Sequence, residues 1–214
     1  MIIIYCVFTK HELRFTKIII KNTAMPRVTR QQTAVNVETI KDVSARLFRE
    51  RGLDGVSVTQ LMAAAGLTHG GFYGHFASKD VLAALACTHA FAQSVQRRSA
   101  MRETFIARYL SHAHRDDPGR GCPASALAAD VGREPDAAPV RQAYADGIKV
   151  MADDLDFLSV ANARAQRRCD TLVGLATLVG AITLARATRG DPISAEILAA
   201  VRTAMAAPHE PSQV

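Results

Sequence analysis

The chain has 214 residues, of which 49% are hydrophobic and 21% are charged, and its formal net charge is +6. This length and apolar content predict a small unit and a larger domain with a genuine packed core. Its four cysteines include no CxxC pair, so neither a zinc site nor a disulfide framework is indicated, and a reduced, cytoplasmic protein is expected. The basic excess is uneven: residues 1–80 hold 11 Lys or Arg against 6 Asp or Glu (+5), whereas the remainder holds 15 against 14 (+1).

The first two dozen residues differ from the rest. The segment MIIIYCVF is apolar for only eight residues and no basic segment precedes it, so it is neither a spanning helix nor a good signal peptide. Because Met25 opens the polar, basic segment MPRVTR, we expect translation to begin there and residues 1–24 to be an upstream extension or a disordered arm. The alternative is a genuine additional strand or arm, since IIIYCVF has high β-propensity.

The next segment has helical spacing. Apolar side chains recur at Ile40, Val43, Leu47 and Phe48, which places them on one face of a helix. Gly52 is expected to end this helix. The side chains expected to point away from the apolar face are Lys41, Asp42, Arg49 and Glu50.

The segment VSVTQLMAAAGLTHGGFYGHFASKD (56–80) predicts two short helices joined by a glycine turn. Ser57 and Gln60 have the spacing of a capping box, so a helix should begin near Val58. Gly66 can adopt positive φ and end it. Thr68 then supplies a hydroxyl N-cap for a second helix that runs to about residue 76, as a DNA-binding helix-turn-helix requires.

The second helix carries chemistry suited to a nucleic acid. His69, Gly70 and Gly71 add little bulk at its start, so backbone N–H groups can approach a phosphate closely. An aromatic hydroxyl, an imidazole and an ammonium group follow at Tyr73, His75 and Lys79, and no Asp or Glu lies between residues 55 and 79. Taken singly, these three side chains also fit a partly buried tyrosine, a surface histidine and a solvated lysine.

These residues resemble the TetR family of transcriptional regulators. The resemblance rests on LFRERGLDGVSV (47–58) and QLMAAAGLTHGGFYGHFASKDVL (60–82), and it covers roughly residues 37–85. It implies an all-α homodimer with an N-terminal three-helix DNA-binding domain and a larger C-terminal helical domain that dimerises and binds an effector. The DNA contacts expected from the motif and its flanks are Ser57, Thr59, Thr68, His69, Gly70, Gly71, Tyr73, His75 and Lys79.

One departure from the family pattern affects base recognition. Gly71 and Gly74 lie in the second helix of the pair, the recognition helix, at positions where larger polar side chains could contact the bases directly. Direct readout is therefore expected to be sparse and to depend on Thr68, His69 and Tyr73, together with DNA shape.

The predicted domains follow from this assignment: a DNA-binding domain at 25–83, an effector-binding and dimerisation domain at 84–207, and a tail at 208–214. Ser78 is expected to cap a long connecting helix, whose tilt would change the separation of two reading helices in a dimer. The run from Cys169 to Ala187 is apolar on nearly all sides but too polar for confident membrane insertion. With the helix that follows Pro192, it is expected to form a four-helix dimer interface; a monomer that uses both helices only as core is the alternative.

The effector pocket is expected to be apolar with a few polar groups. Aromatic and sulfur side chains of the middle helices are the candidates, although each also fits simple core packing: Phe91, Phe105, Tyr109, Tyr144, Met151 and Phe157. Cys122 precedes Pro123 at a predicted helix start, where a thiolate would have a lowered pKa and react with oxidants or electrophiles. A small buried cysteine that packs the helix end is the alternative.

The sequence therefore predicts a dimeric, ligand-responsive repressor, with a thiol-based sensor acting through Cys122 as the alternative. The predicted partners are a double-stranded DNA operator, a small-molecule effector and a second copy of the chain, with no membrane, cofactor or metal. An enzyme is disfavoured because His112 and His114 lie two apart and no nucleophile-base grouping or phosphate loop occurs. A helical interaction protein that has lost DNA binding is a further alternative.

Overall fold

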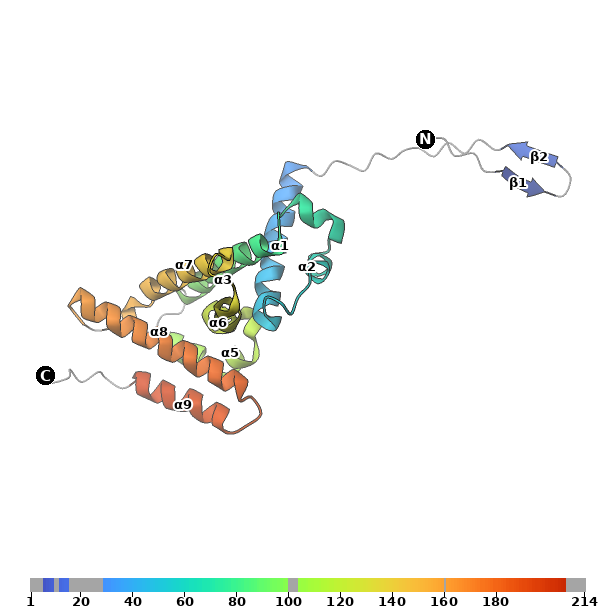
Figure 1. Ribbon diagram of the computed structural model, residues 1–214. Helices are drawn as coiled ribbons and strands as arrows, with labels where there is room; N and C mark the ends of the chain where they lie inside the picture. Colours follow the sequence, from blue (N-terminus) through green and yellow to red (C-terminus); the bar gives the residue numbers. More distant parts are fainter. Residues whose placement is uncertain (1–5, 10–11, 16–28, 100–103, 160, 207–214) are drawn as a thin grey trace.

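The computed structural model describes residues 6–9, 12–15, 29–99, 104–159 and 161–206 (Figure 1). From Arg30 onward every element is helical, as expected. The α-helices are α1 (Arg30–Arg51), α2 (Val58–Ala64), α3 (Lys79–Ser99), α4 (Phe105–Tyr109), α5 (His112–Asp116), α6 (Pro123–Arg133), α7 (Pro139–Asp154), α8 (Arg164–Ala187) and α9 (Ile193–Ala206). The 3-10 helices with described bounds are η1 (His69–Gly74), η3 (Pro118–Arg120) and η4 (Asp156–Leu158).

The N-terminal segment contains two short strands, β1 (Cys6–Thr9) and β2 (Glu12–Phe15). They pair antiparallel, with Cys6 opposite Phe15 and Thr9 opposite Glu12. This agrees with the β-propensity of the apolar segment. The proposed start at Met25 and the predicted tail at 208–214 lie outside the described residues.

Helix α1 is set by its two caps and its apolar face. The Thr29 hydroxyl accepts a hydrogen bond from the Gln32 amide at 3.1 Å, and Gly52 ends the helix at φ +81°. Ile40, Leu47 and Phe48 are buried and Val43 is partly buried, as expected from their spacing.

The expectation that Arg49 faces solvent is wrong. Its side chain is only 5% exposed, and its guanidinium donates to the Gly119 carbonyl through Nε at 2.8 Å and through a terminal nitrogen at 2.5 Å. Arg49 lies in the last turn of α1 against the segment that precedes α6, so its long side chain reaches a loop carbonyl instead of water.

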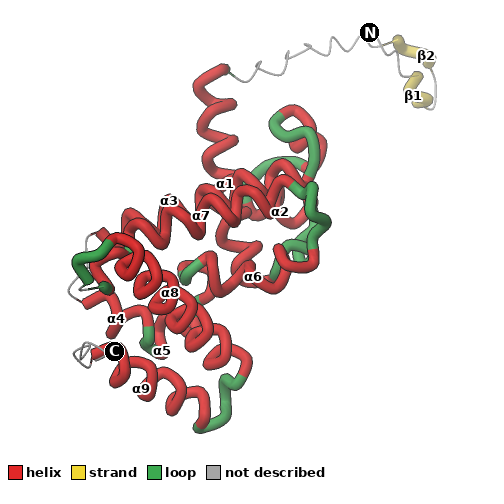
Figure 2. Tube along the Cα trace, turned by 60° about the vertical axis from the view of Figure 1, so that its left-hand side comes forward, coloured by secondary structure: helices red, strands yellow, loops and turns green. Residues whose placement is uncertain are grey.

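Helices α3 and α7 form the central pair and lie side by side in both views (Figure 2). The Ser78 hydroxyl accepts a hydrogen bond from the Val81 amide at 3.2 Å, which confirms Ser78 as the cap of α3. The two helices approach closely at Gly147, where an added Cβ would lie 2.2 Å from the Phe91 ring. Helix α3 is continuous through residue 83, so the predicted domain boundary falls within one helix.

Helix α8 has two apolar faces. Its inward face buries Leu175, Leu178 and Ile182 in the core, whereas Val173 and Leu184 are 60% and 56% exposed in the single chain. Helix α9 packs along α8, with Leu198 buried between them. By length and composition α8 is also apolar enough to cross a membrane, a property that core helices of soluble proteins share.

Candidate nucleic-acid interface and ligand cavity

The first helix of the predicted pair forms as its sequence indicates. The Ser57 hydroxyl accepts from the Gln60 amide at 3.2 Å, and the Ser57 amide donates to the Gln60 side-chain oxygen at 2.9 Å, which completes the capping box. Helix α2 begins at Val58, and Gly66 follows it with φ +72°. Both expectations are confirmed.

The second helix differs from the expectation. It is the short 3-10 helix η1, which ends at Gly74, and the Thr68 side chain makes no capping hydrogen bond. The last turn returns to an α-type bond, since the Phe76 amide donates to the Phe72 carbonyl at 2.9 Å. Three glycines in six residues lower helix propensity, and no side-chain cap compensates for this. Phe72 and Phe76 are buried and hold the segment against the body.

The outer surface of η1 presents most of the predicted contacts. Thr59, Thr68, His69 and Gly70 are exposed, and Tyr73 is 69% exposed, which is high for so large a ring. The Thr59 hydroxyl lies 3.2 Å from His69 Nδ1 and links α2 to η1. The Tyr73 ring packs edge-on against His69 and Phe72, with ring centroids 6.4 and 5.2 Å apart.

The remaining predicted contacts differ in accessibility. Ser57 is exposed and Gly71 is half-buried. His75 is also half-buried: its ring lies beside Phe76 and its Nδ1 is buried without a hydrogen-bond partner. Lys79 is the first residue of α3, and its Nζ lies 3.9 Å from a carboxylate oxygen of the fully exposed Asp54.

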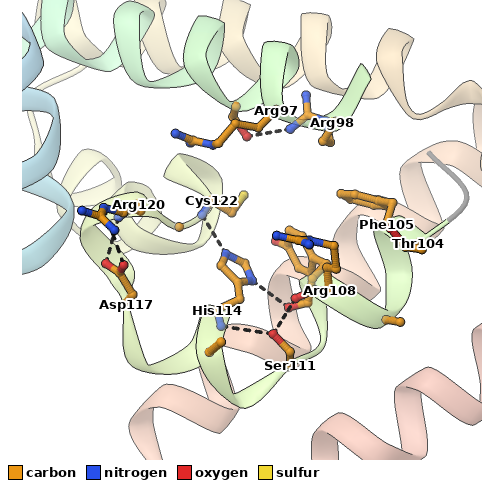
Figure 3. Close-up of a pocket in the computed structure, with 15 residues that line it drawn as sticks. Arg97, Arg98, Thr104, Phe105, Arg108, Ser111, His114, Asp117, Arg120 and Cys122 are labelled. Atoms are coloured by element: carbon orange, nitrogen blue, oxygen red, sulfur yellow. Dashed lines mark hydrogen bonds and ion pairs between the residues drawn. The ribbon is translucent and has the colours of Figure 1, made fainter. Parts of the chain in front are cut away.

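A cavity of about 800 Å³ lies at the opposite end of α3 (Figure 3). Arg97 and Arg98 form one side of it, and the segment from α4 to the start of α6 forms the other. A volume of this size suits a small organic ligand. The described residues that line it are Ser94, Arg97, Arg98, Thr104, Phe105, Ala107, Arg108, Tyr109, Ser111, Ala113, His114, Asp117, Arg120, Gly121 and Cys122.

The deepest charge in this cavity is Arg98, which is 6% exposed. Its Nε donates to an Asp154 oxygen at 2.7 Å, and one terminal nitrogen donates to the Ser94 hydroxyl, also at 2.7 Å. The other terminal nitrogen is buried without a hydrogen-bond partner. The same holds for the hydroxyl of Tyr109, which is 7% exposed and whose pKa is raised well above its usual value, chiefly by burial.

His114 and Cys122 form the floor of the cavity. The Cys122 amide donates to His114 Nε2 at 2.9 Å, while His114 Nδ1 lies 2.6 Å from the Tyr109 carbonyl oxygen. This pattern requires a neutral imidazole with its proton on Nδ1. Burial lowers the pKa of His114 to about 4, which keeps the ring neutral at physiological pH.

Comparison with known proteins assigns the N-terminal unit. Residues 40–86 match the sequence model for bacterial regulatory proteins of the tetR family. This segment therefore carries the N-terminal domain of the TetR family. A segment of 58 residues is 38% identical to the HTH-type transcriptional regulator AcrR of Shigella flexneri. That match spans 27% of this chain and 27% of the length of AcrR.

Solved structures extend the likeness of fold beyond this domain to most of the chain. The reduced form of Escherichia coli NemR superposes with a TM-score of 0.63 at 20% identity, over 79% of this chain and 96% of NemR. A TetR-family regulator from Cytophaga hutchinsonii gives 0.63 at 21% identity, over 82% and 95%. FadR of Bacillus subtilis, solved with stearoyl-CoA, gives 0.55 at 15% identity, over 78% and 96%.

The residues predicted to bind the effector separate into two groups in this fold. Phe105 and Tyr109 line the cavity, whereas Phe91, Tyr144 and Met151 do not. Phe91 and Met151 are buried in the core between α3 and α7, and the Tyr144 hydroxyl donates to the Ala124 carbonyl at 2.7 Å. Phe157, half-buried, packs edge-on against Phe105. Aromatic and sulfur content alone does not separate core from lining.

Sequence reasoning missed the arginines of the cavity. A usable signal existed in α3, where the buried positions Cys87, Phe91 and Ser94 continue at helical spacing to Arg98. A charged residue on the buried stripe of a helix needs a special reason to be there. Arg97, Arg108 and Arg120 carry no comparable signal, because their place on the cavity wall depends on how α4, η3 and the end of α3 meet.

Proposed function

We propose that this protein is a ligand-responsive repressor that binds a near-palindromic operator as a homodimer and is released from it by a small-molecule effector. The observation that carries the proposal is the course of α3, which begins at Lys79 beside η1 and ends at Arg97 and Arg98 in the cavity. Its 21 residues span about 30 Å at 1.5 Å per residue. A cytoplasmic location follows from this role.

The reading surface supports binding to DNA. We assign contacts to the exposed residues around η1 and to Lys79, in a stretch from residue 55 to 79 that contains no acidic side chain. Gly70 and Gly74 have open space where a Cβ would lie, so packing within the protein does not require glycine there. Close approach of a DNA backbone gives a reason for both.

A stripe along α8 supports dimerisation. Its members repeat every three or four residues on the side that faces away from the core. They are Cys169, Leu172, Val173, Ala176, Gly180, Thr183, Leu184 and Ala187. Pairing of this stripe with its copy in a partner would bury the exposed valine and leucines, and two reading elements would then face half-sites about one helical turn (~34 Å) apart.

A second connection supports coupling between the cavity and the reading unit. The Arg49 guanidinium holds the Gly119 carbonyl, which lies two residues from Asp117 and one from Arg120 on the cavity wall. The Leu53 amide donates to an Asp130 oxygen of α6 at 2.9 Å. An effector that displaces the η3 segment would therefore move α1 as well as α3.

Electrophoretic mobility shift with the promoter beside its own gene tests DNA binding. The wild type should shift this fragment at low concentration, with marked salt dependence. Tyr73→Phe removes only a hydroxyl and keeps the ring contacts, so affinity for the operator should fall about tenfold or less while affinity for random DNA is unchanged. Absence of any preference for double-stranded fragments at low salt would overturn the proposal.

A thiol-based sensor is the second candidate, favoured by the position of Cys122 on the cavity wall. Cys122 precedes the first turn of α6 and is 3% exposed, so a reagent would reach it only through the cavity. If this sensor operates, N-ethylmaleimide releases the wild type from DNA and leaves Cys122→Ser bound. Cys87→Ala is the control, since Cys87 is a described free thiol that lies outside both the cavity and the α8 stripe.

A further inference from the structure

The cavity has an excess of positive charge. Four arginines line it, at positions 97, 98, 108 and 120, and Asp117 is the one acidic residue among the described lining residues. Arg120 Nε is 4.0 Å from an Asp117 oxygen, so this carboxylate offsets the charge of Arg120 and leaves three arginines of the lining without a lining carboxylate. Burial and the neighbouring Arg98 lower the pKa of Arg97, as expected where guanidinium groups gather.

Two buried donors in the wall lack acceptors. One terminal nitrogen of Arg98 has none, although its other nitrogens are bound by Asp154 and Ser94. The Tyr109 hydroxyl makes no hydrogen bond of normal geometry, and the Cys122 thiol beside it is a weak partner. Both side chains are more than nine-tenths buried, and buried polar groups without partners are rare in folded proteins.

Two more arginines lie next to the cavity and are not bonded to a described carboxylate. Arg186 donates to the carbonyls of Arg115 and His114 and to the Ser125 hydroxyl. Arg49 donates to the Gly119 carbonyl. Their described hydrogen-bond partners are neutral oxygens. No carboxylate bonded to them therefore offsets their charge, and both guanidinium groups raise the positive potential of the site.

Part of the wall that α4 and α5 form is apolar. Phe105 is 6% exposed and packs against Tyr109 with ring centroids 5.4 Å apart, and Ala107 and Ala113 also line the space. A ligand with both an acidic group and an apolar part would satisfy the two kinds of surface at once.

We propose that the effector is an organic anion whose acidic group is bound by the free donors of Arg98 and Tyr109, with its apolar part against Phe105. This inference rests on the proposed effector response and names the chemical class of the effector. A carboxylate or a phosphate would serve, because each accepts hydrogen bonds from an arginine and from a hydroxyl. Arg97, Arg108 and Arg120 supply attraction at the entrance.

A matched pair of fluorescent probes tests the charge requirement. The anion 8-anilinonaphthalene-1-sulfonate and neutral N-phenyl-1-naphthylamine differ only by a sulfonate, so titration of the full-length protein with each isolates the contribution of the acid. We expect saturable binding of the anionic probe, about one per chain, at least tenfold tighter than the neutral probe. Octanoate or octyl phosphate should displace it, and whichever competes better identifies the acidic group, whereas 1-octanol should not.

Variants locate the binding site. Tyr109→Phe removes one hydroxyl and preserves the ring, and Arg98→Gln removes the charge; each should weaken the anionic probe about tenfold and change the neutral probe less than twofold. Because Arg98→Gln removes the guanidinium that bonds to Asp154, Tyr109→Phe is the decisive variant if Arg98→Gln does not fold. Arg168→Gln is the matched control, since Arg168 pairs with Asp153 and does not line the cavity.

The outcomes separate this inference from the proposed function. Equal binding of the two probes, no saturable binding of the anion, or full binding by a folded Tyr109→Phe protein would each overturn the anionic effector. The assay contains no DNA, so such a failure leaves the repressor proposal standing. Conversely, tight anion binding that depends on Tyr109, in a protein that does not bind DNA, would support the anion site and overturn the repressor proposal.

Discussion

Lys79 is a predicted DNA contact that also lies near a carboxylate of the protein itself. Its Nζ lies 3.9 Å from the Asp54 carboxylate, which is fully exposed and therefore holds it weakly. We expect Lys79→Ala to weaken all DNA sequences alike and to lower the salt slope of log affinity by about 0.9, as loss of one phosphate contact requires. Asp54→Asn is the complementary variant and should raise affinity about twofold. Affinities measured over a salt series check both, and an unchanged slope in Lys79→Ala would remove this residue from the interface.

His114 gives the fold a specific dependence on pH. Burial lowers its pKa in the folded state from 6.5 to about 4, so between these values the unfolded chain binds more protons. The stability from neutral His114 is therefore fully present above pH 6.5 and is lost as pH falls towards 4, by at most roughly 3 kcal/mol. Urea unfolding from pH 7 to pH 4.5 should show this loss, and His114→Gln should flatten the slope. Equal slopes in both proteins would mean that His114 titrates normally.

Local signals predicted residues whose partners are near in sequence. Ser57 and Gln60 are three apart and bond to each other, and Gly66 adopts positive φ at the end of α2. Arg49 was predicted wrongly because its partner, the Gly119 carbonyl, is 70 positions away. Periodicity shows which face of a helix is apolar, but it cannot show that a polar residue on the other face meets a loop.

Among the helices, the position of η1 was predicted correctly, but it is a 3-10 helix and not the α-helix expected. Thr68 stands at the N-cap position with no side-chain bond, and the short 3-10 geometry is set by its glycines and by the burial of Phe72 and Phe76. The existence and order of the long helices α1, α3, α8 and α9 followed from their apolar spacing. The cavity did not, because α4, α5 and η3 are too short to show a period, and their packing against α3 is a tertiary property.

The contact between α3 and α7 depends on one glycine. An added Cβ at Gly147 would lie 2.2 Å from the Phe91 ring, so the helices must separate or the buried ring must move. Gly147→Ala should lower the free energy of unfolding by about 1–3 kcal/mol despite the better helix propensity of alanine.

Chemical denaturation measures this change against a matched control. Gly132→Ala adds the same methyl group in α6, where nothing lies within 4 Å, and should be neutral or stabilising by about 0.5 kcal/mol. Similar unfolding free energies for the two variants would show that α3 and α7 tolerate a wider separation at this point.

At the scale of the whole molecule, charge and apolar surface are separated along the fold. The basic cavity lies at one end of α3 and the predicted DNA-binding surface at the other, while the exposed apolar residues of α8 face away from the buried core. An exposed apolar stripe is unfavourable in water and is typical of an interface. A partner subunit that covers it would also fix the distance between the two DNA-binding surfaces. Dimerisation and operator affinity are therefore expected to fail together.

A charge in the α8 stripe tests this coupling. Val173 is 60% exposed in the single chain, so Val173→Glu should leave the protomer folded but bury an unpaired carboxylate in a dimer. We expect a monomer by sedimentation equilibrium at micromolar concentration and at least a hundredfold loss of operator affinity, with half-site affinity retained. Val150→Glu, which places the same charge at an exposed valine of α7, should remain dimeric and bind normally. A dimeric Val173→Glu protein with full affinity for the operator would contradict an interface on this face of α8, since Val173 would then make no apolar contact with a partner.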